Sequence, residues 1–178
     1  MLYELRVVLK DVEPPVWRTI RVPENVTLHR LHQVLQIAMG WTNSHLYLFN
    51  VGGKVYGEPS PEWDWEVQDS TSTTLEEIVS KGGPSFLYEY DLGDSWMHEV
   101  TLQETVEAGG EERPRCTGGA RACPPEDCGG SSGYEYFLEA ISDPVHDEHE
   151  RMLEWVGGHF DPEEFEAGAL DRALELLL

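Results

Sequence analysis

Basic residues are scarce in this sequence of 178 residues. Lys and Arg number 12 against 34 Asp and Glu, which gives a formal net charge of −22 at pH 7. Nucleic-acid backbones are bound by clustered Lys and Arg, and the one local group here, Arg113, Arg115 and Arg121, lies beside Glu111 and Glu112. We therefore expect no direct nucleic-acid binding. An acidic surface suits a basic protein partner, mimicry of DNA, or solubility alone.

Long apolar segments are also missing, since none approaches the roughly 20 residues that a membrane-spanning helix needs. The first six residues, MLYELR, place charges where a signal peptide needs an apolar stretch. We expect a cytoplasmic protein without a membrane span. Apolar residues still make up 40% of the chain and include six Trp and seven Tyr. That suffices for the core of a single domain over residues 1–178.

Cysteine is limited to Cys116, Cys123 and Cys128. In a cytosolic chain such a cluster is typical of metal binding or redox chemistry rather than of a structural disulfide. A structural zinc site needs four ligands, so a histidine, a carboxylate or a water would have to complete it, and His98 or His146 could do so only if the fold brings them close. The alternatives are three reduced thiols in a loop or a redox pair. The spacing of the three cysteines does not distinguish between these possibilities.

Alternating apolar positions and helical stripes predict an α+β fold. Antiparallel hairpins form a sheet, an amino-terminal helix packs on it, and the carboxy-terminal third is helical. The helix over 28–39 has Thr27 as its N-terminal cap and Gly40 as its stop. The expected strands are 3–9, 17–22, 45–51, 54–56, 86–90 and 96–102, and the expected further helices are 74–82, 134–141, 143–156 and from 161 to the end.

Residues 105–132 are rich in Gly, Pro and Cys and show little periodicity, so we expect an irregular loop there. A loop of that length in a compact domain is usually functional, disordered or held by a ligand. In its second part, Glu126 and Asp127 suit a cation or a basic side chain, while Gly129 and Gly130 allow close backbone approach. Together with Tyr134 they predict a rigid binding loop.

The segment 90–98 carries the other candidate site. Asp91, Asp94 and His98 could serve general acid–base catalysis or hold a metal, and Trp96 could contact a ligand. For His98 and for the two Asp residues, a structural role is the stronger interpretation. His98 shares its strand face with apolar residues, and Asp next to a glycine turn often bonds backbone amides. His45, after the first helix, is a lesser candidate of the same structural kind.

Histidines and acids also meet in the segment HDEHE at residues 146–150. On a helix, His146 would share a face with His149 and Glu150. The pattern is not HExxH, and it is more typical of a solvated charged face.

Several segments together resemble the family named after the third open reading frame of an agrobacterial root-inducing plasmid. They lie in order along nearly the whole chain: PPVWR at 14–18, LHRLH at 28–32, GW at 40–41, HL at 45–46, YDLGDSWMH at 90–98, ACPPEDCGG at 122–130, DP at 143–144 and FDPEEF at 160–165. The resemblance implies a compact α+β fold and an association with mobile elements. Cys128 occupies a position that need not be cysteine in that family.

Some family members carry a resolvase-like name, which we do not transfer. A recombinase needs a basic surface facing DNA and an activated nucleophile, and this acidic chain offers neither pattern. The leading hypothesis is a non-catalytic binding or accessory module that presents 90–98 and 116–134 as one surface. The alternatives are a zinc-dependent, hydrolase-like enzyme built on the same residues and an acidic DNA mimic that binds a basic protein.

Overall fold

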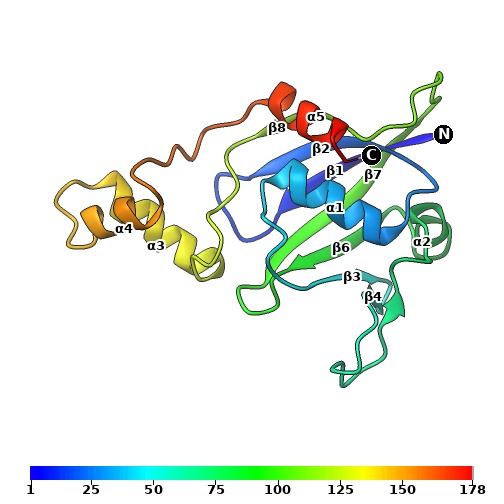
Figure 1. The fold of residues 1–178 in the computed structure, drawn as a ribbon, viewed down its shortest axis with the longest axis horizontal. Helices are drawn as coiled ribbons and strands as arrows, with labels where there is room; N and C mark the ends of the chain where they lie inside the picture. Colours follow the sequence, from blue (N-terminus) through cyan, green and yellow to red (C-terminus); the bar gives the residue numbers. More distant parts are fainter. Residues whose placement is uncertain (178) are drawn as a thin grey trace.

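The computed structural model describes residues 1–177 and has an α+β fold. One eight-stranded sheet has the strand order β5-β4-β3-β6-β7-β1-β2-β8, and α1 lies across one of its faces (Figure 1). The strands are β1 Leu2–Leu9, β2 Trp17–Pro23, β3 Tyr47–Val51, β4 Lys54–Gly57, β5 Gln68–Asp69, β6 Ser85–Tyr90, β7 Trp96–Val106 and β8 Arg115–Ala120; the helices are α1 Leu28–Met39, α2 Leu75–Gly82, α3 Gly130–Ser142, α4 His149–Trp155 and α5 Ala167–Glu175.

The hairpins predicted from alternating sequence are present. β1 pairs antiparallel with β2, β3 with β4, and β6 with β7. All but one of the neighbouring strand pairs are antiparallel, and the exception is the short parallel pair of β4 with β5. The pairing of β1 with β7 joins the amino-terminal hairpin to the central strands. Among residues 1–177, no helix is long and apolar enough to cross a bilayer.

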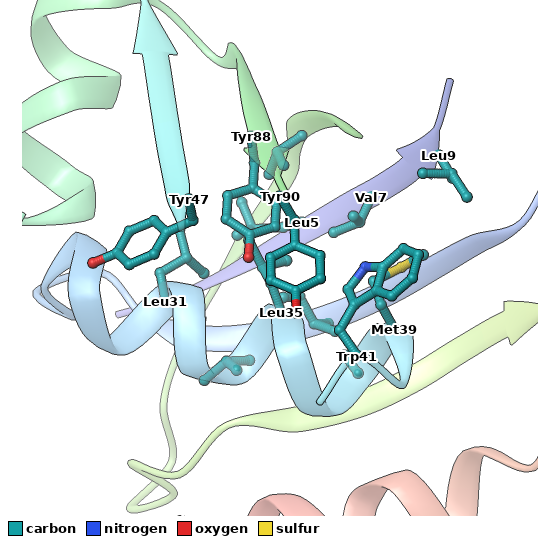
Figure 2. Packing of buried hydrophobic residues seen from close by; sticks show 14 of the residues in the cluster. Leu5, Val7, Leu9, Leu31, Leu35, Met39, Trp41, Tyr47, Tyr88 and Tyr90 are labelled. Atoms are coloured by element: carbon teal, nitrogen blue, oxygen red, sulfur yellow. The ribbon is translucent and has the colours of Figure 1, made fainter. Parts of the chain in front are cut away.

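Helix α1 begins and ends where its capping residues predict. The side chain of Thr27 accepts a hydrogen bond from the N–H of Arg30, and Gly40 ends the helix in the left-handed conformation with φ 110°. Leu31 and Leu35 of α1 are fully buried. In Figure 2 they belong to the packed layer between the helix and the strands. Burial of this apolar stripe fixes α1 on the sheet.

Arg18 of β2 is buried and holds the carboxyl end of α1. Its Nε donates to the carbonyl of Ala38 at 2.7 Å, and its Nη2 donates to that of Met39 at 3.2 Å. Nη1 donates to the carbonyl of Ala120 at the end of β8, and the guanidinium lies over the ring of Phe165. A cation at a helix C-terminus is favourable. Arg18 therefore connects α1, β2, β8 and the chain before α5.

Strand β8 corrects the expectation of an irregular loop over the whole of 105–132. Residues 115–120 pair antiparallel with β2, and the register shifts between Thr19 and Ile20. The sequence RCTGGA has no apolar alternation, so it carries no strand pattern. Gly119 is needed because a Cβ there would come within 2.6 Å of the ring of Phe165. Tertiary packing, rather than local propensity, creates this strand.

The carboxy-terminal third is helical, with boundaries that differ from the predicted ones. α3 and α4 contact each other and extend away from the sheet, while α5 returns over β8 beside α1 (Figure 1). The helix expected from 143 begins only at His149. The helix expected from 161 begins at Ala167, because Asp161–Glu164 form a single turn before Phe165 packs on Arg18. Residue 178, which the last prediction included, lies outside the described residues.

Candidate functional site

The turn between β6 and β7 contacts the loop after β8. Asp91, just after β6, has a φ of 59°, and its Oδ1 accepts hydrogen bonds from the N–H groups of Gly93 at 3.0 Å and Asp94 at 3.3 Å. Asp94 Oδ2 accepts a hydrogen bond from the N–H of Gly129 at 3.1 Å. The segments 90–98 and 116–134 therefore meet through direct hydrogen bonding.

Glycines after Cys128 allow this close approach. A Cβ on Gly130, whose φ is 72°, would lie 2.6 Å from the carbonyl oxygen of Asp94, and a Cβ on Gly133 would lie 2.0 Å from that of Cys128. Both distances are shorter than any side chain tolerates. Gly130 thus serves the packing of the loop on the Asp94 turn.

Glu126 joins the same loop to the end of α1. Its Oε1 accepts hydrogen bonds from the N–H of Thr42 at 2.8 Å, the hydroxyl of Thr42 at 3.0 Å and the hydroxyl of Tyr90 at 2.9 Å. Burial raises the pKa of Tyr90 to about 12, so this hydroxyl stays a donor. Glu126 Oε2 is buried and has no hydrogen-bond partner among residues 1–177.

His45 lies at the centre of three carboxylates. Its Nε2 is 2.7 Å from Asp127 Oδ1, 3.5 Å from Asp91 Oδ2 and 3.9 Å from Glu126 Oε2. We call His45, Asp91, Glu126 and Asp127 the His45 cluster. The imidazole is 30% exposed and Asp127 is 67% exposed, whereas the Asp91 side chain is only 9% exposed. One side of the cluster therefore faces solvent while its base is buried.

The electrostatics of the cluster favour a positive charge. Desolvation of His45 lowers its pKa, but the hydrogen bond to Asp127 and the charges of Asp91, Asp127 and Glu126 outweigh that effect, so the pKa of His45 is raised. One ligand atom each from His45, Glu126 and Asp127 lies within 4.8 Å of the others. Ligands about 2.1 Å from a metal stand about 3 to 4 Å apart, so small side-chain movements would let these groups coordinate one ion.

His98 lies in the core, away from the His45 cluster. Its Nδ1 donates to the backbone carbonyl of Tyr88 at 3.1 Å, and its Nε2 accepts from the indole N–H of Trp41 at 3.2 Å. The side chain is fully buried, and burial lowers the pKa of His98 to about 4. With both nitrogens bonded and no charge, His98 has the structural role that its strand face predicts.

Trp96 and Tyr134 are packing residues in this fold. Trp96 is 1% exposed and Tyr134 is 1% exposed, and their rings meet edge to face at 6.5 Å between centroids. Trp96 also packs on Trp41. These aromatic contacts attach the first part of α3 to the β6–β7 hairpin, so both residues position the loop without offering a surface to a ligand.

The three cysteines and His98 are not brought together. Within residues 1–177, the one group of three or more potential ligands within 4.8 Å is His45, Glu126 and Asp127. Cys116 lies in β8, and all three thiols are free. Burial raises the pKa of each thiol, to about 12 for Cys128. Cys116 is buried, Cys123 and Cys128 are half-buried, and a metal site on the three cysteines stays a prediction.

Comparison with known proteins assigns the chain to a protein family. Residues 1–169 match the model of the plasmid pRiA4b ORF-3-like proteins. The chain belongs to this family. The pRiA4b ORF-3-like chain is 45% identical over 154 residues to uncharacterized protein y4hQ of Sinorhizobium fredii, which covers 86% of this chain and 79% of that protein.

A solved structure shares the fold of this pRiA4b ORF-3-like chain. It is the crystal structure of MM3350, a protein of unknown function from Methanosarcina mazei Go1, with a TM-score of 0.86 and 35% identity. The match covers 94% of this chain and 96% of the other. Neither relative's name states an activity, so an argument about function depends on the geometry of the site.

His45 is the residue that sequence reasoning undervalued in this pRiA4b ORF-3-like chain. The sequence indicates a structural role for it, because it lies where a helix is followed by a strand, and Glu126 is 81 positions away. One signal was available: His45 follows the stop of α1 within a segment that carries the family resemblance. Thr42 and Tyr90, which orient Glu126, carry no sequence signal for that role.

Proposed function

We propose that this chain is a non-catalytic binding module whose His45 cluster holds one divalent cation. The observation that carries the proposal is Glu126 Oε2, a buried carboxylate oxygen without a hydrogen-bond partner among the described residues. Burial of an unpaired charged atom is costly. A cation between Glu126, Asp127 and His45 would give this oxygen a partner and would replace the proton that His45 now shares with Asp127.

The donor set indicates the kind of ion. One imidazole nitrogen with carboxylate oxygens suits Zn²⁺ or Mn²⁺. Glu126 is also oriented in advance, because three donors hold Oε1 and leave Oε2 directed at the cluster. Such outer contacts to a ligand typically change metal affinity 10- to 100-fold.

Isothermal titration of Mn²⁺ and Zn²⁺ into protein purified without a metal-affinity tag tests the proposal. We expect one saturable site at pH 7.5, with Zn²⁺ bound more tightly than Mn²⁺. Glu126→Gln keeps the shape of the side chain and an acceptor for Thr42 and Tyr90, yet it removes the charge. We expect this variant, and His45→Gln, to weaken binding at least about 10-fold.

Two exposed residues provide matched controls for these substitutions. Glu164→Gln and His159→Gln change the same residue types outside the cluster, and both should bind the ions as the wild type does. The proposal is wrong if the wild type shows no saturable binding, or if Glu126→Gln and Glu164→Gln bind equally well.

The other hypotheses receive less support from the geometry. A zinc hydrolase that uses Asp91, Asp94, His98 and the cysteines lacks its histidine, because His98 is buried and fully bonded. A DNA mimic for a basic protein is supported by the net charge of −22 alone. We retain a cytoplasmic location and an accessory role in a mobile element as parts of the proposal.

A further inference from the structure

A cavity of about 480 Å³ lies beside the His45 cluster. Its volume is in the range of small-molecule sites. Residues 127–129 form one wall, and Phe137 of α3 and Met152 and Trp155 of α4 form others. Asp127 belongs to both features, since its Oδ1 bonds His45 at 2.7 Å while the residue lines the cavity. Asp127 is therefore the residue at which the cavity and the His45 cluster meet.

The walls contributed by α3 and α4 are aromatic and partly open. Phe137 and Trp155 meet edge to face at 5.8 Å between centroids. Tyr136, which also lines the cavity, is 45% exposed, and Trp155 is 48% exposed. Large aromatic side chains left half exposed around one cavity are typical of a binding site for a flat apolar group.

The charge of the lining differs from that of the molecule as a whole. Its charged residues are one acid, Asp127, and one base, Arg151, in a chain with 34 acids and 12 bases. Arg151 is held by Glu148, to which Nε and Nη2 donate. A guanidinium offers five donors and suits planar acid groups. With a divalent ion on Asp127, the cavity would present two cationic groups to a ligand.

We infer that this cavity binds a small aromatic acid. The aromatic body lies among Phe137, Tyr136 and Trp155, and the acid group binds the cation of the His45 cluster and Arg151. The inference depends on the proposed function, because the net charge of −22 repels an anion unless the cation is present. It names the class of ligand that the binding module recognises.

Phenylphosphonate and inorganic phosphate distinguish the aromatic contribution from simple anion binding. Each is titrated by calorimetry into the full chain, with and without saturating Mn²⁺. We expect phenylphosphonate to bind the metal-loaded protein at least 10-fold more tightly than inorganic phosphate does. Removal of Mn²⁺ should reduce its affinity by at least 10-fold.

Two tryptophans of similar exposure, Trp155 and Trp65, provide the matched test of the cavity. Trp155→Ala should lower phenylphosphonate affinity at least 10-fold and leave Mn²⁺ binding unchanged, whereas Trp65→Ala, at a site 51% exposed in the loop after β4, should change neither. If Mn²⁺ binds but the two variants bind phenylphosphonate equally, the inference is wrong and the proposed function stands. If Mn²⁺ fails to bind the wild type, the proposed function itself is wrong.

Discussion

Two histidines in this fold show how the same side chain takes opposite roles. His98 lies on a central strand, with Trp41 and Tyr88 as neutral hydrogen-bond partners, and burial lowers its pKa to about 4. His45 lies in a loop among carboxylates, and its pKa is raised. Both residues are histidine, so the side chain itself does not explain the difference in pKa. The depth of burial and the charge of the partners decide that the pKa of one histidine is lowered and that of the other is raised.

A third histidine follows the pattern of His98. His32 of α1 is 1% exposed, and its two nitrogens lie 2.8 Å from the hydroxyl of Tyr88 and 2.8 Å from Asn43 Oδ1. Burial lowers its pKa to about 4. Since Gln36 donates to the same hydroxyl, Tyr88 donates to His32 Nδ1, and His32 Nε2–H donates to Asn43. As at His98, burial among neutral hydrogen-bond partners keeps the imidazole of His32 neutral.

The largest expected difference between the two regions is in stability. His98→Ala leaves a cavity and an unpaired indole N–H on Trp41, so we expect it to lower the free energy of unfolding by about 3 to 5 kcal/mol. His45→Ala should cost less than about 1 kcal/mol, because the side chain is partly exposed. Urea denaturation at pH 7.5 measures both. Equal losses would contradict the assignment of His98 to the core.

Substitution of a glycine should affect the region of the His45 cluster and leave the region of His98 unchanged. A Cβ on Gly133 would meet the Cys128 carbonyl at 2.0 Å, so Gly133→Ala should shift the loop that carries Asp127 and cost about 1 to 3 kcal/mol. It should also weaken Mn²⁺ binding. Gly168→Ala is the control, since a Cβ in that helical position has only an ordinary contact at 3.5 Å and should be neutral or stabilising by up to about 1 kcal/mol.

An NMR spectrum of the histidine side chains checks that the effect is local. The imidazole signals of His98 should keep their wild-type shifts in Gly133→Ala, while those of His45 should change. Unchanged Mn²⁺ affinity in this variant would show that the loop does not position the His45 cluster.

Local patterns predicted the regular parts of the fold and missed those that depend on distant contacts. The hairpin of β1 and β2 and the caps of α1 follow from alternation and from Thr27 and Gly40. Strand β8 could not be predicted, because Gly118 and Gly119 carry no strand propensity and are accommodated by β2 and Phe165. Helix α5 begins later in the chain than predicted for the same reason, because Phe165 packs on Arg18.

The candidate site was predicted in part. Glu126 and Asp127 are predicted to bind a cation or a basic side chain from their stiff, glycine-flanked loop, and they do lie together with His45. His98 could be assigned to the core from the face of its strand. His45 could not be joined to them, since only the packing of α1, the β6–β7 turn and the loop after β8 brings positions 45, 91 and 126 together.

The smallest expected effect is the pH dependence that His45 adds to stability. Its pKa is above the unfolded value of about 6.5, so the folded state binds the proton more tightly. The stabilisation is fully present below about pH 6.5 and is lost as the pH rises through the folded pKa. Solvent screening keeps it below about 1 kcal/mol. In EDTA, His45→Gln should therefore be less stable than the wild type at pH 5.5 and equal to it at pH 9.

Side-chain NMR titration in metal-free buffer completes this comparison. His45 should titrate above pH 6.5, whereas His98 and His32 should stay neutral until the pH approaches about 4. Because a metal displaces the proton from His45, Mn²⁺ affinity should rise with pH over the same range in which His45 titrates. If His45 titrated below pH 6.5, the carboxylates would not be acting on it, and the electrostatic basis for a cation in the His45 cluster would be removed.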